Sequence, residues 1–204
     1  MTVTGARVRV RVPGSCPRCG GRGRTIPGKA ADKVAPALKD LLAPKHRNEI
    51  CFTRSYDDAH LKQHPKQKVR EMSFLVEVEH LKDDNLYRYN FTMRVGIRGQ
   101  KKRLQTSGEC GWAYAEQPSQ NAVIRCGVEC DGGGVTIEQQ RGTNNLLVHL
   151  AEVNDSGQRR AGRIRMAACG EDDEANSVDL VSGADDRTFR LTKAPASICR
   201  AGVR

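Results

Sequence analysis

Hydrophobic and polar residues alternate along residues 87–98, where the chain reads YRYNFTMRVGIR. A β-strand turns successive side chains to opposite faces of a sheet, so this period of two predicts a strand with one buried and one solvated face. Shorter runs with a related pattern occupy residues 74–79, 102–113, 122–130, 134–140, 145–153, 162–168 and 187–192. About eight short strands therefore account for most of the chain after residue 70.

Turn-forming residues separate these runs. They are Arg98-Gly99-Gln100-Lys101, the Asp131–Gly134 stretch, Arg141-Gly142 and Asn154-Asp155-Ser156-Gly157. Glycine, asparagine and aspartate favour tight turns between antiparallel strands, so we expect an all-β, mainly antiparallel barrel or sandwich in one domain, residues 46–204. Its expected interior consists of Tyr87, Phe91, Val95, Trp112, Val128, Ile137, Val148, Ile164, Phe189 and Leu191.

Residues 1–45 differ from this domain in composition. They are basic and rich in Gly, Pro and Arg, so we expect a largely disordered leader. A short amphipathic helix is predicted at 31–43, with Val34, Leu38, Leu41 and Leu42 on one face and with Pro36 and Pro44 limiting its length. The net charge of +10 is concentrated in this part of the chain, because residues 1–50 hold 11 of the 34 basic and only 3 of the 24 acidic residues.

A basic stripe lies on the polar face of the long strand and in the turn after it. It comprises Arg88, Arg94, Arg98, Lys101, Lys102 and Arg103. Sheets that bind nucleic acid also need stacking aromatic residues on the same face, whereas the aromatic residues here alternate to the opposite face. We therefore expect a solvated face and no nucleic-acid binding by the β domain, with an anionic polysaccharide or another polyanion as the weaker alternative.

Two cysteines are expected to face each other across a hairpin. If the runs at 102–113 and 122–130 pair about a loop centred near residue 118, Cys110 falls opposite Cys126, and Trp112 falls opposite Ile124. Directly paired residues of antiparallel strands are close enough for a disulfide. Cys130 then faces inward and is free to pair with Cys169 or Cys199. With Cys51, the domain holds six cysteines, which suit three disulfides.

Disulfides form in an oxidising compartment, so we expect a periplasmic or secreted protein. No apolar signal-peptide core is visible in residues 1–30, which keeps a cytoplasmic location as the alternative. The chain contains no run of 18 apolar residues, and we expect no transmembrane segment.

One metal site remains as an alternative. Cys16-Pro-Arg-Cys19 resembles a single knuckle of a zinc ribbon or of the cysteine-rich region of heat-shock co-chaperones. Those sites need a second pair of ligands, which only His60 and His64 offer here. The long intervening span and Pro65 argue against this set. The alternative protein would be intracellular and zinc-binding, with a basic leader that contacts nucleic acid.

No catalytic arrangement stands out. The glycines of Asp131–Gly134 precede a strand pattern and lack the Lys-Ser/Thr of a phosphate loop. The acidic clusters at 169–174 and 183–187 lack the ligand spacing of a calcium loop and are interpreted as solvated. Cys51 with His60 or His64 is the remaining nucleophile–base pair, and a structural disulfide at Cys51 is favoured over it. His149 alternates outward and is expected at the surface.

Five segments carry a resemblance to small uncharacterised secreted proteins of alphaproteobacteria. They are YDDAHLKQHPKQKVREM (56–72), GECGW (108–112), CGVECDGGG (126–134), ACGEDDE (168–174) and DDRTFRL (185–191), within a match over about residues 51–199. The resemblance implies an extracytoplasmic domain that holds the six cysteines, and it implies no activity. The spread of the cysteines, the neutral charge of the domain and the lack of an arranged nucleophile, base or metal cage predict a non-enzymatic ligand- or protein-binding module without a cofactor. Its loops at 113–121, 154–158 and 171–186 are expected to supply recognition.

Overall fold

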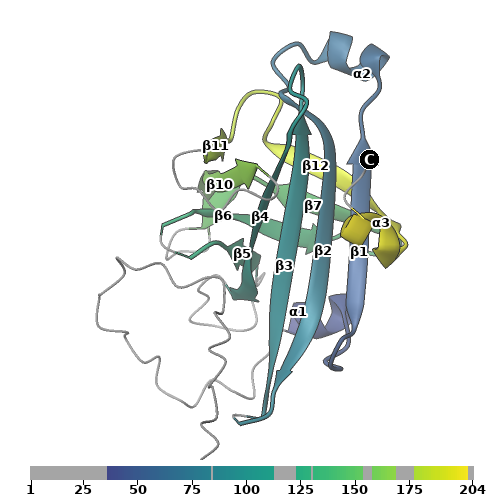
Figure 1. The fold of residues 1–204 in the computed structure, drawn as a ribbon, viewed down its shortest axis with the longest axis vertical. Helices are drawn as coiled ribbons and strands as arrows, with labels where there is room; N and C mark the ends of the chain where they lie inside the picture. The colour runs from purple at the N-terminus through teal and green to yellow at the C-terminus, as the bar shows by residue number, and fades with distance from the viewer. Residues whose placement is uncertain are drawn as a thin grey trace, which may run out of the picture.

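The structure is a computed structural model that describes residues 36–83, 85–112, 123–129, 131–153, 158–168 and 177–201. Eight antiparallel strands form a closed barrel (Figure 1). In order around the barrel they are β1 (Glu49–Ser55), β2 (Val69–Leu81), β3 (Leu86–Ile97), β4 (Arg103–Trp112), β5 (Ile124–Gly127), β6 (Gly134–Gln139), β7 (Asn145–His149) and β12 (Thr188–Ala194), which returns to β1. The predicted all-β antiparallel class is confirmed, and the architecture is a barrel rather than a sandwich.

Four further strands lie between β7 and β12 in the chain. β8 (Ala151–Val153) and β9 (Arg159–Ala161) form a separate hairpin. β10 (Arg163–Ala168) pairs with β11 (Val178–Val181) and also with the start of β4, where Ala167 faces Gln105. On this side of β4, β5 pairs with the last residues of the strand and β10 pairs near its start. The two ends of β4 therefore have different neighbours.

The barrel interior is filled by side chains. Its largest fully buried residues include Phe52, Phe74, Phe91, Phe189, Met72 and Met93. Seven of the ten expected interior residues are buried: Phe91, Val95, Ile137, Val148, Ile164, Phe189 and Leu191. Val128 packs against this core while remaining partly exposed, and the side chain of Trp112 lies outside the described part.

Tyr87 corrects the predicted interior, because 37% of its surface is exposed. It lies one residue into β3, opposite His80 and next to the turn between β2 and β3. Its ring stacks on the His80 ring with 4.8 Å between centroids. The alternating pattern of β3 begins at the hairpin turn, outside the buried core. Tyr87, the first aromatic residue of the pattern, therefore contacts His80 and solvent.

Two disulfides are present among the described residues, one between neighbouring strands and one between β1 and a C-terminal helix. Cys110 and Cys126 are bonded inside the barrel, in the predicted register that also pairs Trp112 with Ile124. Cys51 is bonded to Cys199 of helix α3 (Ala196–Ala201), which holds that helix on the outside of β1 and β2. This bond rules out the pairing of Cys130 with Cys199 that the sequence left open. The other option, Cys130 with Cys169, stays a prediction, because both positions lie outside the described residues.

One short helix lies at each end of the barrel (Figure 1). Helix α1 (Pro36–Leu41) lies within the predicted 31–43 segment, and Leu38, Leu41 and Leu42 belong to the barrel core. The core therefore begins before residue 46, while residues 1–35, with Val34, are not described. Helix α2 (Asp58–Gln63) lies at the opposite end. No helix among the described residues has the length and hydropathy needed to cross a membrane.

Candidate functional site

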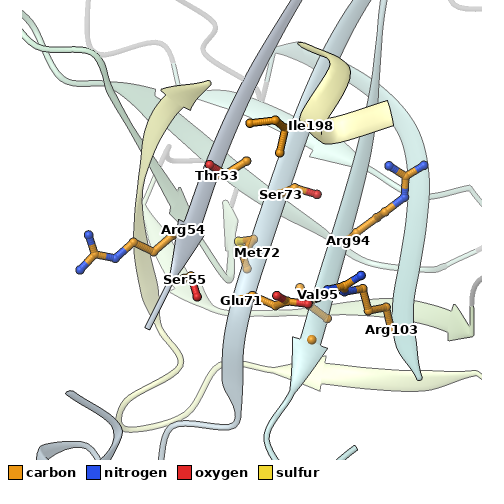
Figure 2. A pocket seen from close by; sticks show the side chains of 11 residues that line it. Thr53, Arg54, Ser55, Glu71, Met72, Ser73, Arg94, Val95, Arg103 and Ile198 are labelled. Carbon is orange, nitrogen blue, oxygen red and sulfur yellow. Dashed lines mark hydrogen bonds and ion pairs between the residues drawn. The ribbon is translucent and has the colours of Figure 1, made fainter. Parts of the chain in front are cut away.

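Two cross-strand rows of side chains form a shallow groove on the outer wall of β1 to β4. The first row contains Thr53, Ser73, Arg94 and Gln105, and the second contains Ser55, Glu71, Gly96 and Arg103. Phe52, Met72, Phe74, Val95 and Leu104 alternate with these residues along the strands and are buried in the barrel core, so the period of two that builds the core also builds this outer surface. Ile198 of α3 borders the groove, which has a volume of about 130 Å³ (Figure 2).

Helix α3 is anchored beside the first row. The Cys51–Cys199 disulfide fixes the helix to β1, and the guanidinium group of Arg94 donates to the Cys199 carbonyl. Arg94 also donates from Nε to Gln105 Oε1 at 2.6 Å, so its orientation is set from both sides. This leaves the Ile198 side chain 41% exposed at the groove border. Figure 2 shows Ile198, Thr53 and Ser73 grouped at one end of the groove.

An ion pair closes the second row. Arg103 and Glu71 are bonded through Nε and Oε1, and each side chain is about three-quarters buried, with exposures of 26% and 24%. Gly96 lies between them in the register, and a Cβ atom there would approach Glu71 Cγ to 2.5 Å. Glycine at this position therefore gives the Glu71 side chain the space it needs to reach Arg103.

The end of the barrel at α2 is held together by backbone hydrogen bonds to carboxylates. Asp186 accepts from the amides of Lys68 at 2.6 Å and Val69 at 3.2 Å, and Asp185 accepts from the Lys66 amide at 3.0 Å. Asp57 caps α2 by accepting from the His60 amide at 2.7 Å. Asp185 and Asp186 of the predicted acidic cluster at 183–187 therefore fix a loop instead of remaining solvated.

The two histidines of the zinc alternative stack on each other. Their ring centroids are 4.3 Å apart, and the His60 ring also stacks on Tyr56 at 4.6 Å. His60 Nε2 is 3.0 Å from Gln67 Oε1. Nitrogen atoms of stacked rings do not converge on one point as tetrahedral zinc ligands do. Cys16 and Cys19 are not described, and the described residues contain no group of three or more His, Cys, Asp or Glu that could hold a metal ion.

Tyr56 lies at the base of this stack. The Arg54 guanidinium is 5.1 Å from its ring centroid, so arginine, tyrosine and two histidines form a continuous column. Burial raises the pKa of Tyr56 above 10.0, which keeps its phenol neutral. The nucleophile–base pair considered for Cys51 is not assembled, because its sulfur atom is bonded to Cys199.

His149 lies on the outer face of β7, as predicted, but its side chain is only 13% exposed. Nδ1 is 3.0 Å from Thr188 Oγ1, and Nε2 is 3.9 Å from Glu138 Oε2. Burial, followed by the nearby Arg159 charge, lowers the pKa of His149 below 6.5. The expected surface position is therefore corrected: neighbouring strands and the β9 residue Arg159 surround a side chain that alternation alone would leave in water.

The predicted basic stripe divides into two parts. Arg88 bonds Glu109 at 3.0 Å, while Arg94 and Arg103 have the groove partners described above. Arg98 lies nearer α2, where its amide donates to the Lys68 carbonyl at 2.8 Å. Arg88, Arg94 and Arg103 are therefore bonded to other side chains on the outer wall of β3 and β4. The rest of the stripe, Arg98, Lys101 and Lys102, lies at the α2 end.

Comparisons with protein-family models, curated proteins and solved structures find no match to this chain.

Proposed function

We propose that this chain is a non-enzymatic, extracytoplasmic binding module, and that the groove beside α3 is its recognition surface. Two disulfides support the compartment, because such bonds persist where the redox environment is oxidising. The filled interior supports recognition on the outer wall, since Phe52, Phe74 and Phe91 occupy the space that a ligand would need.

The groove is the main evidence for a binding function, because it combines a small hollow with polar groups that are fixed in position. An engineered cavity of about 150 Å³ holds one benzene-sized molecule, so a groove of about 130 Å³ suits a single ring or branched side chain. Ile198 supplies an apolar border, and the hydroxyls of Thr53 and Ser55 can bond the backbone of a bound segment. A partner protein presenting one apolar side chain from an extended segment fits this chemistry.

Preorganisation also supports binding at this place. The walls come from four hydrogen-bonded strands, a disulfide-bonded helix and the Glu71–Arg103 pair. A surface whose side chains are already ordered loses less entropy when a partner docks.

A peptide-display selection against the full chain tests the groove. Selected peptides should bind the wild type, and Ser55→Trp, which fills the second row, should weaken their binding at least roughly tenfold. Ile198→Asp should do the same by placing a charge on the apolar border. Val181→Asp is the matched control, because Val181 is 52% exposed on β11 outside the groove. Equal binding by all four proteins would contradict the proposal.

Thiol alkylation and metal analysis test the oxidising compartment and the zinc-binding alternative. Protein purified from an oxidising compartment should resist alkylation at Cys51, Cys110, Cys126 and Cys199 until a reductant is added. The same preparation, made without chelator, should contain no stoichiometric zinc. One zinc per chain that is lost in Cys16→Ser would favour the intracellular zinc-binding protein instead.

A further inference from the structure

The α2 end of the barrel gathers exposed basic side chains from three separate segments. They are Lys62, Lys66 and Lys68 around α2, Arg98, Lys101 and Lys102 in the turn between β3 and β4, and Arg187 before β12; together these residues are called the basic end. The turn between β3 and β4 and helix α2 lie at the same end of the molecule (Figure 1).

Hydrogen bonds between the segments hold the basic end together. Arg98 donates from its amide to the Lys68 carbonyl at 2.8 Å and from its guanidinium to the Leu61 carbonyl at 3.3 Å. The Lys66 and Lys68 amides donate to Asp185 and Asp186, the residues directly before Arg187. The backbone that carries these cations is therefore fixed in position. The Arg98 guanidinium lies against α2, and the side chains of Lys62, Lys66, Lys68, Lys101 and Arg187 are exposed.

The carboxylates at this end are occupied with structural bonds. Asp57 caps α2, Asp58 pairs with Arg70 at 3.1 Å, and Asp185 and Asp186 accept from backbone amides. Arg70 offsets Asp58, and the remaining three carboxylates are outnumbered by Lys62, Lys66, Lys68, Arg98, Lys101 and Arg187, so positive charge remains in excess there. A cluster of like charges on a fixed frame attracts a ligand that carries several negative charges.

The surroundings decide which kind of polyanion fits. The exposed large apolar residues of the described chain are Tyr87, Val178, Val181 and Ile198, and none belongs to the basic end, so it offers no wedge for a lipid bilayer. The rings of Tyr56, His60 and His64 stack on one another, which leaves no row of free ring faces for nucleic-acid bases. A chain of anionic sugars needs only spaced cations and hydrogen-bond donors.

We propose that the basic end binds a linear acidic polysaccharide through its carboxylate groups. This site goes beyond the groove of the proposed function and uses none of its lining residues. Its cations are arranged by the folded barrel. Binding should weaken as salt rises, since the contacts are between exposed charges.

Immobilised polygalacturonate provides the probe, and binding of the full chain is measured at low and at physiological salt. Lys62→Gln, Lys66→Gln and Lys68→Gln together should weaken binding roughly tenfold or more at low salt. The matched control replaces three exposed lysines at the α1 end, with Lys39→Gln, Lys45→Gln and Lys82→Gln, and should change binding less than about twofold. Both proteins keep the leader and have the same net charge.

All six lysines are exposed, so both triple variants should keep the wild-type thermal midpoint. Ser55→Trp should also bind polygalacturonate as the wild type does, which separates this site from the groove. Equal losses in the two triple variants, or no loss in either, would overturn the proposal. Tighter binding to duplex DNA or to phosphatidylglycerol vesicles, compared at equal charge concentration, would overturn it in favour of those ligands.

Discussion

The two ends of the barrel are closed by different chemistry. At the α1 end, Leu38, Leu41 and Leu42 enter the core, and the Tyr89 hydroxyl donates to the Leu42 carbonyl at 2.9 Å. At the α2 end, Leu61 is the residue of the helix that enters the core. The remaining closure there comes from carboxylates that accept from backbone amides and from Arg98, which donates to the Lys68 and Leu61 carbonyls.

The α1 end is built to stabilise the fold, and the α2 end is built to present side chains to a partner. An apolar helix stabilises the fold by removing its side chains from water, and it leaves few groups available to a partner. A loop fixed through its backbone keeps its side chains free, so the α2 end can display lysines without disturbing the core. We therefore expect substitutions of buried apolar residues at the α1 end to change stability, and substitutions of exposed lysines at the α2 end to change binding.

The largest effect is expected for Leu41→Ala in α1. This residue is 5% exposed, and deleting a buried leucine side chain leaves a cavity that typically costs about 2–5 kcal/mol. Denaturant unfolding measures the change. Lys39→Ala on the same helix is the control and should alter stability by less than about 0.5 kcal/mol. If the two variants were equally stable, α1 would not be part of the core.

A smaller loss is expected for Asp186→Ala at the α2 end. The substitution removes the acceptor of two backbone amides, and leaving buried donors unsatisfied costs about 1–3 kcal/mol. Asp185→Ala is the comparison, because that carboxylate accepts from one backbone amide and is partly exposed. Chemical unfolding should rank Asp186→Ala as the less stable protein. The reverse order would contradict the assignment of Asp186 as the main tether.

Tyr89→Phe should cost about 0.5–1.5 kcal/mol, because it removes one hydrogen bond at the α1 end and leaves the ring in place. Tyr87→Phe is the matched control, since its ring is exposed and it should be close to neutral. Thermal midpoints of the two variants check the difference. A larger loss from Tyr87→Phe would mean that the barrel extends further along β3 than the structure shows.

The subtlest prediction concerns pH. Because burial lowers the pKa of His149 below 6.5 in the folded state, the unfolded chain takes up a proton first as the pH falls. The stabilising contribution of neutral His149 is therefore present above pH 6.5 and is lost as the pH falls toward the folded-state pKa. His149→Gln should reduce the difference in thermal midpoint between neutral and mildly acidic solution.

Arg159→Gln sharpens the same prediction. The Arg159 charge contributes to lowering the pKa of His149, so its removal should make the loss of stability in acid smaller than in the wild type. A wild type that gains stability on acidification through this range, while His149→Gln does not, would contradict the sign of the effect.

The sequence predicted the parts of the fold that depend on local alternation. Residues of β3 pair with residues of β2 and β4, with one register shift near Val69, and the same antiparallel pairing places Cys110 opposite Cys126. Strand β1 was missed because both faces of its first half are covered. Phe52 points into the barrel, while Cys51 is buried on the outside beneath α3, so the polar half of the pattern is incomplete.

The groove could not be predicted from the sequence, because its residues meet only after four strands and α3 have assembled. No short segment contains both Glu71 and Arg103, and the space that joins them depends on Gly96 of a third strand. The basic end was predicted in part. Arg98, Lys101 and Lys102 were recognised as a basic cluster, but their approach to the lysines around α2 follows from the barrel topology.

Amide chemical-shift mapping of the full chain with soluble oligogalacturonate is the most direct test of polysaccharide binding at the α2 end, because it reports both ends of the barrel in one experiment. Shifts should concentrate in residues 60–68, 98–102 and 185–187 and leave 38–48 and 80–86 unchanged. Shifts centred on the α1 end, or confined to the leader, would contradict the claim that the α2 end is the binding end of this barrel.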